Sequence, residues 1–401
     1  MAPMLVKPLR AQAIELYRHA YGASPDAAAS APACVDLIGG HTDYNGGPVL
    51  TIATGERSVV AVGLGEPGTI EGITGDDRRH ERVDLREGTP VGWLAVVAGV
   101  LRELAAFGPV PGGARVAVVS DIARGGGLGF RAALAVALAK ALTALGRQTL
   151  TPRQVAGVGF RALSDGGKTR RGIMEHTTAA LAHPNHALLI ECASAETRRV
   201  PLNARVLLVH ADAPADADRA TTERRLECEA AVLRLKMDLP ELLWLASWPT
   251  AWMPRLKRAL PEPLRSRAVH VVGETARTRF AAELLAKGRL TRCGELLYES
   301  HESCHRLFDA STPQADLVVA AARRAGALGA RLAGDGVTGN VVVLLGKGKE
   351  RGKGEEGRGK GEAKVVDAIQ RAYSNAYGRE ATITPVRPGG GAKVEAVPSA
   401  R

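Results

Sequence analysis

Apolar residues recur along much of the chain with the three- and four-residue spacing of one helix face. In the segment 91–107 they are Trp93, Val97, Val100, Leu101 and Leu104. This spacing predicts a helix with one buried face. Similar spacing, or a helix-start signal such as Thr151-Pro152, predicts further helices at 10–22, 132–145, from 152 onward, 172–182, 221–236, 274–287, 294–307, 314–325 and 365–377.

Shorter apolar runs between turn residues predict strands. They lie at 35–38, 49–53, 58–63, 114–119, 187–191, 205–210 and 381–386, with two more inside 329–345. The alanine-rich stretch 23–33 predicts a loop. The low-complexity stretch 346–363, GKGKERGKGEEGRGKGEA, predicts a mobile surface loop. Strands and helices mixed throughout favour an α+β protein with a boundary near residue 200.

A glycine-rich turn at 124–129 lies between a predicted strand and the predicted helix 132–145. In such an arrangement, backbone N–H groups at the start of the helix can hold a phosphate group. The turn is therefore a candidate nucleotide-binding segment.

Composition narrows the class of protein. The 401 residues are 45% hydrophobic and 24% charged, with a formal net charge of +11, so the chain can bury a substantial core. Positive net charge favours anionic partners such as nucleotides, nucleic acids or phosphorylated sugars. A generally basic composition with one lysine-rich insert explains the same charge.

The cysteines and the apolar runs indicate the compartment. The five cysteines are dispersed and form no CxxC pair, which is typical of a reducing compartment. No apolar run reaches the length of a membrane span, and residues 1–10 lack the apolar core of a signal peptide. We expect a soluble, cytoplasmic protein without a membrane partner. The insert has no aromatic residues to stack on bases, so no nucleic-acid partner is expected.

Residues 39–47, GGHTDYNGG, place polar side chains in a glycine-flanked turn between two predicted strands. Asp43 can accept two hydrogen bonds from hydroxyl groups, and His41 can donate or accept one. These groups suit a small polyhydroxy ligand. A structural turn would need Asn-Gly but not the preceding His-Thr-Asp. The residues alone leave both interpretations open.

The same segment resembles the sugar-binding signature of the galactokinase branch of the GHMP sugar kinases, a pattern close to GRVNLIGEHTDYNGG. Other segments resemble that family in the same order along the chain. They are 172–175 (GIMD in the family), 186–192 (HALLIDC), 201–202 (from VPL), 224–228 (RRxEC), 267–274 (RHVVxE) and a third glycine motif after 329.

The resemblance implies a fold and a reaction. The fold is the two-lobed α+β GHMP kinase fold, with a ribosomal S5-like N-terminal domain at 1–202 and a ferredoxin-like C-terminal domain at 203–401 that carries the insert 346–363. The reaction is ATP-dependent phosphorylation of a monosaccharide at its anomeric hydroxyl, with galactose as the first candidate. The alternatives are a related sugar such as arabinose or galacturonate, and a catalytically inactive sensor of sugar or nucleotide.

Several positions differ from the family pattern. Cys34 replaces the arginine that favours phosphoryl transfer, Asp36 replaces an asparagine, and Gly40 replaces the sugar-contacting glutamate. A thiol cannot supply a fixed positive charge, which motivates the inactive alternative. ATP and Mg²⁺ are the implied cofactors. However, the phosphate loop lacks serine and Leu163 falls on or near the position of the magnesium-binding glutamate, so no metal ligand is assigned.

The resemblance also implies roles for individual residues. Glu175 stands at the family's catalytic aspartate and is the expected general base. Arg171 is the expected substitute for the missing positive charge, with a solvated basic turn as the alternative. The expected substrate-binding residues are Gly40, His41, Thr42, Asp43, Gly172 and Thr221. The expected ATP-binding residues are Arg124, Gly125, Gly126, Gly127, Leu128, Gly129, Phe130 and Arg131.

Residues 301–305, HESCH, also satisfy the HExxH pattern of zinc proteases, with both histidines on one helical face. A catalytic zinc needs a third protein ligand, and none follows at a suitable spacing. Since the family resemblance covers this stretch too, we favour a helix of the kinase fold over a zinc site.

Overall fold

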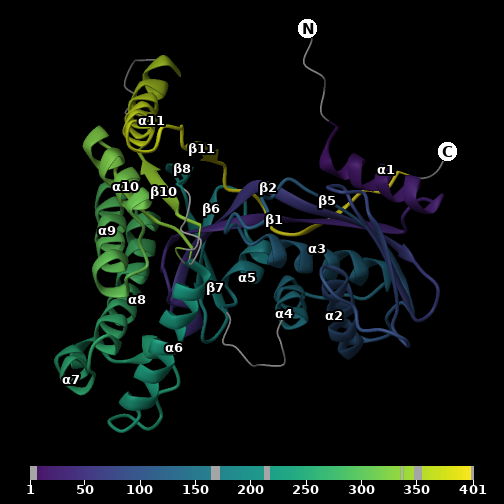
Figure 1. Ribbon diagram of the computed structural model, residues 1–401, viewed down its shortest axis with the longest axis horizontal. Helices are drawn as coiled ribbons and strands as arrows, with labels where there is room; N and C mark the ends of the chain where they lie inside the picture. Colours follow the sequence, from purple (N-terminus) through teal and green to yellow (C-terminus); the bar gives the residue numbers. More distant parts are fainter. Residues whose placement is uncertain are drawn as a thin grey trace.

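The computed structural model describes residues 7–163, 172–211, 217–334, 336, 338–346 and 355–398. Figure 1 shows two lobes side by side, each with a sheet covered by helices, which confirms the expected two-lobed α+β architecture. The α-helices are α1 (Leu9–Tyr21), α2 (Leu94–Leu104), α3 (Phe130–Leu145), α4 (Pro152–Ala162), α5 (Met174–Leu181), α6 (Ala217–Leu235), α7 (Met253–Ala259), α8 (Leu264–Ala286), α9 (Leu290–Ser303), α10 (Pro313–Ala325) and α11 (Glu355–Tyr377).

The first lobe is built on an eight-stranded sheet. Its strands are β1 (Ala27–Ile38), β2 (Pro48–Leu64), β3 (Thr69–Thr74), β4 (His80–Asp84), β5 (Ala114–Ser120), β6 (His186–Glu191), β7 (Glu196–Pro201) and β12 (Lys393–Glu395). They follow the order β12-β1-β2-β5-β3-β4, with β6 pairing β2 and β7 pairing β6. Helices α2 to α5 pack on one face of the sheet and α1 packs on the other.

Two of these strands differ from the sequence expectation. β1 begins at Ala27, inside the stretch predicted to be a loop, and every residue of β1 is buried. Alanine is small enough for a strand that is covered on both faces, so the alanine run does not mark a turn here. β2 is one continuous strand rather than two. Its polar stretch 55–57 lies where the strand passes from pairing with β6 to pairing with β5.

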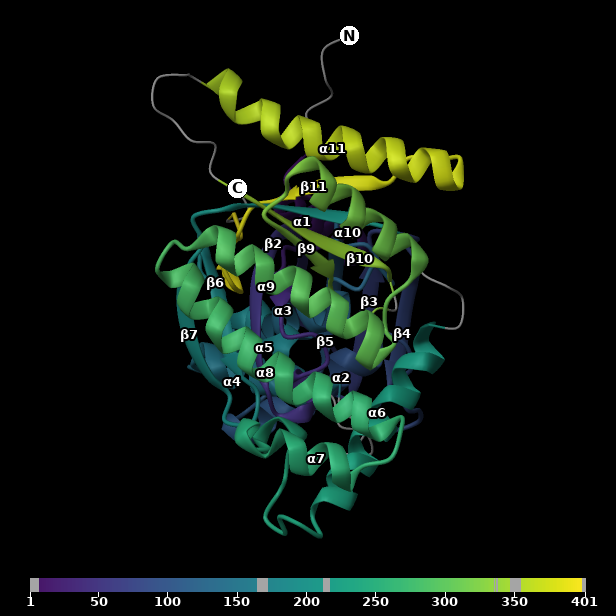
Figure 2. The same ribbon diagram turned by 90° about the vertical axis from the view of Figure 1, so that its left-hand side faces the viewer.

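The second lobe has a four-stranded antiparallel sheet in the order β11-β8-β10-β9. The strands are β8 (Arg205–His210), β9 (Gly329–Leu332), β10 (Asn340–Leu345) and β11 (Thr382–Val386). Helices α10 and α11 cover one face, and Figure 2 shows α11 lying across the end of this lobe. The other face joins the core of the first lobe, since Leu208 and Val342 belong to the same apolar cluster as Val60 and Leu138.

The lysine- and glycine-rich insert is partly helical. α11 begins at Glu355, so the prediction of a loop over 346–363 is wrong for 355–363, while 347–354 lie outside the described residues. Val365, Ile369 and Tyr373 anchor this helix in the core. A helix that is already nucleated by packing extends by one hydrogen bond per added residue, even through a sequence of low intrinsic helix propensity.

The chain passes from β7 of the first sheet, which ends at Pro201, to β8 of the second sheet, which begins at Arg205. The domain boundary at residue 202 stays a prediction. After the second sheet, β12 returns to pair with β1. All five cysteines are free. In the described part of the chain, no helix is both long and apolar enough to span a membrane.

Arg57 fastens the returning C-terminal segment to the first sheet. Its guanidinium donates hydrogen bonds to the carbonyl oxygens of Gly390 and Gly391, both at 2.9 Å, and to Ser30 Oγ at 3.0 Å. We predict that Arg57→Met lowers the free energy of unfolding by about 1–3 kcal/mol, because the partly buried carbonyl groups of Gly390 and Gly391 lose their donors. Urea denaturation monitored by circular dichroism measures this loss.

Arg18→Met is the matched control. Arg18 donates to the carbonyl of Pro398 in the same segment, but from an exposed position at 3.3 Å. Its loss should change stability by no more than about 0.5 kcal/mol. Equal losses in the two variants would contradict the role given to Arg57.

Candidate active site

The turn after β1 holds the polar residues of the signature in place. Thr42 Oγ1 donates a hydrogen bond to the carbonyl of Gly39 at 2.8 Å or of Pro48 at 2.7 Å. Asn45 Nδ2 donates to the carbonyl of His41 at 2.8 Å. Thr42 and Asn45 therefore fix the backbone, and His41 and Asp43 are left to face the interior of the molecule.

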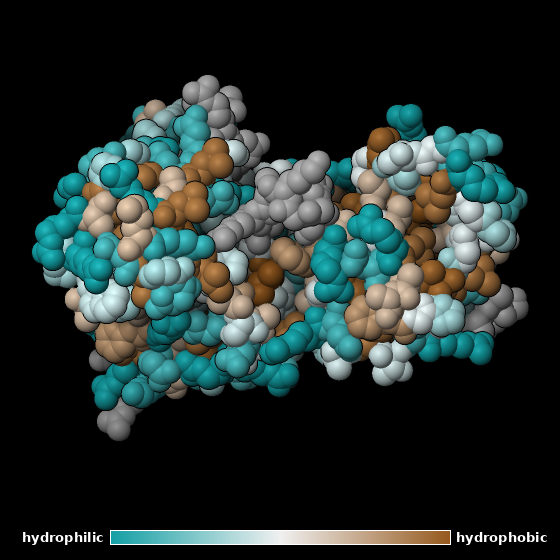
Figure 3. Space-filling model, turned by 90° about the horizontal axis from the view of Figure 1, so that it is seen from below, coloured by the Kyte–Doolittle hydropathy of each residue, from teal (hydrophilic) through white to brown (hydrophobic). Residues whose placement is uncertain are grey.

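His41 and Asp43 line a cavity of about 190 Å³ between the lobes. Figure 3, which views the molecule from below, shows its surface indented near the middle of the long axis. The lining residues are Cys34, Val35, Asp36, Gly39, Gly40, His41, Asp43, Tyr44, Gly127, Gly172, Met174, Glu175, His176, Arg225 and Gly334. The cavity is smaller than the roughly 300–1,000 Å³ of sites for drug-sized ligands, which suits a ligand of a few carbon atoms.

His41 is poised to meet a neutral polar ligand. Its side chain is buried, stacks on Phe308 with ring centroids 4.2 Å apart, and places Nδ1 3.0 Å from the Tyr44 hydroxyl. Burial and the neighbouring cationic side chains lower the pKa of His41 well below 6.5. Its Nε2 has no hydrogen-bond partner among the described residues. A neutral imidazole with one open nitrogen can exchange a hydrogen bond with a ligand hydroxyl.

The absence of a side chain at Gly172 leaves room for the Asp43 carboxylate. A Cβ atom at Gly172 would lie 1.5 Å from Asp43 Oδ2, so no other residue could be accommodated without moving Asp43. Three residues later, Glu175 lies in the first turn of α5, where the helix dipole favours negative charge. Asp43 and Glu175 therefore reach the same cavity from two different segments.

Gly129 brings the glycine-rich loop against Glu175 and Cys34. A Cβ atom at Gly129 would lie 3.4 Å from Cys34 Sγ and 3.5 Å from Glu175 Cδ. Burial, together with the nearby Glu175 and Asp36 carboxylates, raises the pKa of Cys34 well above its ordinary value. The thiol is therefore neutral, and position 34 contributes no charge to the site.

The loop leaves its backbone available at the N-terminus of α3. Gly125, Gly127 and Gly129 have φ values of 73°, 66° and 72°, a left-handed conformation that suits glycine. A Cβ atom at Gly127 would lie 2.4 Å from Thr338 Oγ1, and Asn340 Nδ2 donates to the Gly126 carbonyl at 2.7 Å. Residues of the second lobe therefore pack against the loop and hydrogen-bond to it.

The side chains of the loop point elsewhere. Arg124 forms an exposed ion pair with Asp76 at 2.6 Å and lies over the Phe130 ring, while Arg131 is exposed. The Leu128 side chain is in the apolar core, and its carbonyl accepts a hydrogen bond from Cys34 N–H at 3.1 Å. What the loop offers a ligand is therefore mainly backbone N–H groups.

An ion pair between the lobes explains two departures from the family pattern. Arg331 on β9 is fully buried, and its Nη1 lies 2.6 Å from Asp36 Oδ2. A Cβ atom at Gly40 would lie 2.4 Å from Arg331 Nη2. The guanidinium therefore fills the space that a side chain at 40 would need, and its carboxylate partner is at 36. Burial alone would lower the pKa of Arg331, but the neighbouring Asp36 carboxylate raises it, so the guanidinium stays charged.

The ion pair continues into a buried network that reaches the signature turn. Arg331 Nε donates to Ser300 Oγ at 3.0 Å, and Ser300 Oγ donates to Glu274 Oε1 at 2.6 Å. Glu274 also accepts the Gly39 N–H at 3.0 Å. Burial opposes its charge, but Arg277, His270 and Arg331 hold the pKa of Glu274 at about 2.

The structure brings most of the expected substrate residues together. Gly40, His41, Asp43, Gly172 and Glu175 line one cavity. Thr42 binds backbone carbonyls instead, and Thr221, buried on α6, does not line the described cavity. Arg171 lies outside the described residues.

Sequence reasoning missed the arginine of the second lobe that lines the cavity. Arg225 belongs to the segment 224–228 that matches the RRxEC motif. That match indicated the family but gave no role to Arg225. Sequence reasoning also missed Arg331 and Glu274, since nothing in the sequence pairs them with a turn more than 230 positions away.

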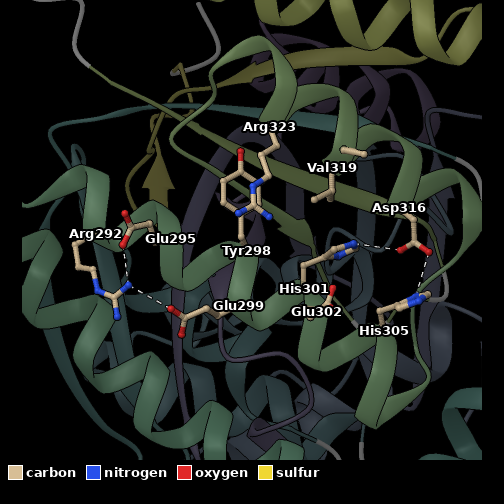
Figure 4. Close-up of a pocket in the computed structure, with 11 residues that line it drawn as sticks. Arg292, Glu295, Tyr298, Glu299, His301, Glu302, His305, Asp316, Val319 and Arg323 are labelled. Carbon is tan, nitrogen blue, oxygen red and sulfur yellow. Dashed lines mark hydrogen bonds and ion pairs between the residues drawn. The ribbon is translucent and has the colours of Figure 1, made fainter.

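The HESCH segment is part of a different, outward-facing cavity of about 730 Å³ (Figure 4). His301 Nε2 and His305 Nδ1 each lie 3.1 Å from one oxygen of Asp316. Glu302 pairs with Arg306, and Cys304 Sγ is buried near Gly40. Within the described ranges, no group of three His, Cys, Asp or Glu residues could hold a metal ion.

Comparison with known proteins gives a consistent result. The galactokinase galactose-binding signature matches residues 15–64, the GHMP kinases N terminal domain matches 95–183, and the GHMP kinases C terminal matches 281–374. A galactokinase of Roseiflexus sp. (strain RS-1) is 33% identical over 383 residues, which cover 94% of this chain and 95% of that protein. A galactokinase of Streptomyces coelicolor is 32% identical over 398 residues, or 96% of each chain.

Solved structures share the fold. Lactococcus lactis galactokinase complexed with galactose has a TM-score of 0.86 at 22% identity, covering 96% of this chain and 99% of that chain. Methanococcus jannaschii mevalonate kinase has a TM-score of 0.59 at 17% identity, covering 90% and 98%.

The ion pair predicts coupling between positions 36 and 40. Asp36→Asn leaves Arg331 without its nearest counter-charge and should lower the free energy of unfolding by about 3–5 kcal/mol. Gly40→Glu alone should also lower the free energy of unfolding. Asp36 holds the Arg331 guanidinium in the space that the glutamate side chain would need. In the double variant, Arg331 is free to turn to the new carboxylate, so much of the loss should return. Urea denaturation of the four proteins gives the coupling energy.

Gly40→Ala in the Asp36→Asn background is the steric control, since it fills space without adding a charge. Effects of Asp36→Asn and Gly40→Glu that add to within about 0.5 kcal/mol would show that the two positions are independent and would contradict the exchange.

Stability should fall as the pH drops from 6.5 toward 4. Burial, with Arg277 and Arg331 nearby, lowers the pKa of His270 to about 4. Between these values the unfolded chain binds a proton at this histidine and the folded chain does not, so acid favours unfolding. At pH 5 the loss from His270 is on the order of 2 kcal/mol, from about 1.4 kcal/mol per pH unit. His41 adds to the effect in the same direction.

Urea midpoints at pH 7 and pH 5 measure this loss. His270→Gln should show a smaller difference between the two pH values than the wild type does. An unchanged difference would mean that His270 is not a source of the acid sensitivity.

Proposed function

This chain belongs to the galactokinase family, and we propose that it transfers the γ-phosphoryl group of ATP to the anomeric hydroxyl of galactose. The observation that carries the proposal is the single cavity in which Asp43, His41 and Glu175 lie next to the glycine loop. A polyhydroxy acceptor, a base and a phosphate-holding backbone are what such a transfer needs.

In this proposal the sugar lies between the two lobes. The Asp43 carboxylate accepts hydrogen bonds from two sugar hydroxyls, and His41 Nε2 exchanges one with a third. Because His41 is neutral and held by Tyr44 and Phe308, it recognises a hydroxyl rather than an anion. Gly40 and Gly172 contribute space and backbone.

Glu175 is the proposed general base. It accepts the proton of the anomeric hydroxyl as the oxygen attacks the γ-phosphorus and the bond to the β-phosphate oxygen breaks. Its side chain is one carbon longer than the family aspartate, and it lines the cavity next to Gly129 of the loop. Proton acceptor and phosphate segment are therefore adjacent.

ATP fits the glycine loop. Gly125 has open space where a Cβ atom would lie, and α3 begins directly after Gly129. Backbone N–H groups at that helix start can hold phosphate oxygens. The expected cytoplasmic location stays a prediction.

Magnesium fits less well. Residues 125–132 contain no hydroxyl or carboxylate side chain, and Leu163, at the expected position of the glutamate, is buried in the apolar core. The residues at these positions do not suit a hard cation, which prefers oxygen ligands. No step of the proposed reaction is therefore assigned to a metal ion bound by them.

ADP release from ATP in the presence of galactose, arabinose, galacturonate and glucose tests the proposal. We expect turnover with galactose and a fall of about 10²–10⁴-fold in kcat for Glu175→Gln, because the base is lost. The affinity for galactose, measured by calorimetry, should change little.

Glu302→Gln is the control, since it removes the glutamate of the HExxH pattern from the outward-facing cavity. Its kcat should equal that of the wild type. Galactose binding without turnover would support the sensor instead, and turnover unaffected by Glu175→Gln would refute the role of Glu175.

A further inference from the structure

Helix α6 carries a second apolar face that is exposed. Its inner face packs within the second lobe, against α8 and its neighbours, through Cys228, Ala231, Val232 and Leu235. The opposite face carries an apolar stripe, here called the α6 stripe, made of Leu226, Ala230, Leu233 and Met237. Met237 lies in the turn that continues the helix, since its N–H donates to the Arg234 carbonyl at 3.3 Å. Figure 2 shows α6 at the edge of the lobe, where a second molecule can reach the stripe.

The α6 stripe has the spacing of an interaction surface. Leu226, Leu233 and Met237 are 60%, 68% and 89% exposed. A single exposed leucine is ordinary, whereas contiguous exposed apolar surface marks a site of interaction. The steps from Leu226 to Met237 are four, three and four residues, as between the a and d positions of a coiled coil. The stripe therefore suits a helix that packs lengthwise against another helix.

The α6 stripe is complementary to itself when two copies of the helix run antiparallel. Its four positions are symmetrical about the midpoint of the stripe. A twofold axis at this midpoint places Leu226 opposite Met237 of the second copy. It also places Ala230 opposite Leu233 of the second copy, so that the small side chain receives the larger one. A parallel pair would set Ala230 against Ala230 and leave a gap, which costs packing energy.

The charges beside the stripe fit the same arrangement. Glu229 and Lys236 are seven residues apart, so they lie on the same flank of the stripe, and both are partly exposed. At 1.5 Å per residue, the antiparallel pair brings Glu229 of one copy within about 3 Å, measured along the helix axis, of Lys236 of the other. The twofold axis produces this contact twice. In coiled coils, charges at such flanking positions determine the partner and its orientation.

We propose that a second copy of this chain docks on the α6 stripe, and that the two α6 helices form the antiparallel core of a twofold-symmetric dimer. The contact is isologous, because each copy contributes the same surface. The stripe spans less than two heptads, so the interface is small, and small interfaces are typical of transient association. The dimer therefore forms and dissociates with protein concentration. This inference does not depend on the proposed function.

Sedimentation velocity of the full chain, from low micromolar to several hundred micromolar concentration, tests the proposal. We expect the sedimentation coefficient of the wild type to rise with concentration from the value of a monomer toward that of a dimer. Leu233→Asp should weaken association at least about 100-fold, because two leucines per dimer lose their burial. Circular dichroism and thermal unfolding show whether the variant is folded.

Leu64→Asp is the matched control. Leu64 is 62% exposed at the end of β2, in the first lobe. Its replacement introduces the same charge at a similarly exposed leucine, away from the α6 stripe. The association constant should equal that of the wild type.

An exchange of charges tests the orientation of the two helices. Glu229→Lys and Lys236→Glu each place like charges in both flanking contacts, so each variant alone should associate about five- to tenfold more weakly than the wild type. A mixture of the two variants has opposite charges in both contacts and should regain an affinity close to that of the wild type. A fluorescent label on one variant distinguishes mixed dimers from self-dimers.

Each contrary result overturns a stated part of the proposal. A wild type that stays monomeric at every concentration overturns the dimer. A dimer that Leu233→Asp does not weaken uses another surface, and a mixture that associates no better than the single variants excludes the antiparallel pair. A monomer that binds vesicles of phosphatidylcholine and phosphatidylserine, and loses this binding in Leu233→Asp, assigns the stripe to a membrane surface instead of a second copy.

Discussion

The buried ion pair between Asp36 and Arg331 is the constraint on which the site depends. It joins a strand of the first lobe to a strand of the second at 2.6 Å, with both side chains almost completely buried. A charge in such a place is costly unless its partner is present, so the two lobes cannot separate here without a large penalty. The same carboxylate accepts the Gly334 N–H at 2.5 Å, which ties the third glycine motif to the sugar signature.

From this pair, several other features follow. Gly40 must lack a side chain because Arg331 occupies that space. Ser300 and Glu274 carry the network from Arg331 to the Gly39 N–H, so the backbone of the signature turn is positioned from the second lobe. His270 Nε2, 3.1 Å from the Gly40 carbonyl, reinforces the same contact. The cavity keeps its shape because both of its walls are hydrogen-bonded to one buried network.

Sequence reasoning predicted the parts of this architecture that depend on local pattern. The helical spacing at 91–107 and the Thr151-Pro152 start correspond to α2 and α4, and the signature and glycine loop do meet at one cavity. Sequence reasoning failed where packing between distant parts of the chain determines the local structure. The alanine run of β1 is a strand because it is covered on both faces, and α11 extends into a low-complexity stretch because its other end is anchored. The partners of Asp36 could not be predicted, since Arg331 is 295 positions away.

A position-by-position comparison with a family pattern treats each differing residue as the loss of a functional group. At positions 36 and 40 this conclusion is wrong, because the two differences are related. The carboxylate absent at 40 has a counterpart at 36, because what the fold requires is a negative charge within reach of Arg331, and either position is close enough to supply it. The hydroxyl absent from the glycine loop has a neighbour in Thr338, which contacts Gly127 from the other lobe. In both cases a group close to the departure comes from another position in the chain.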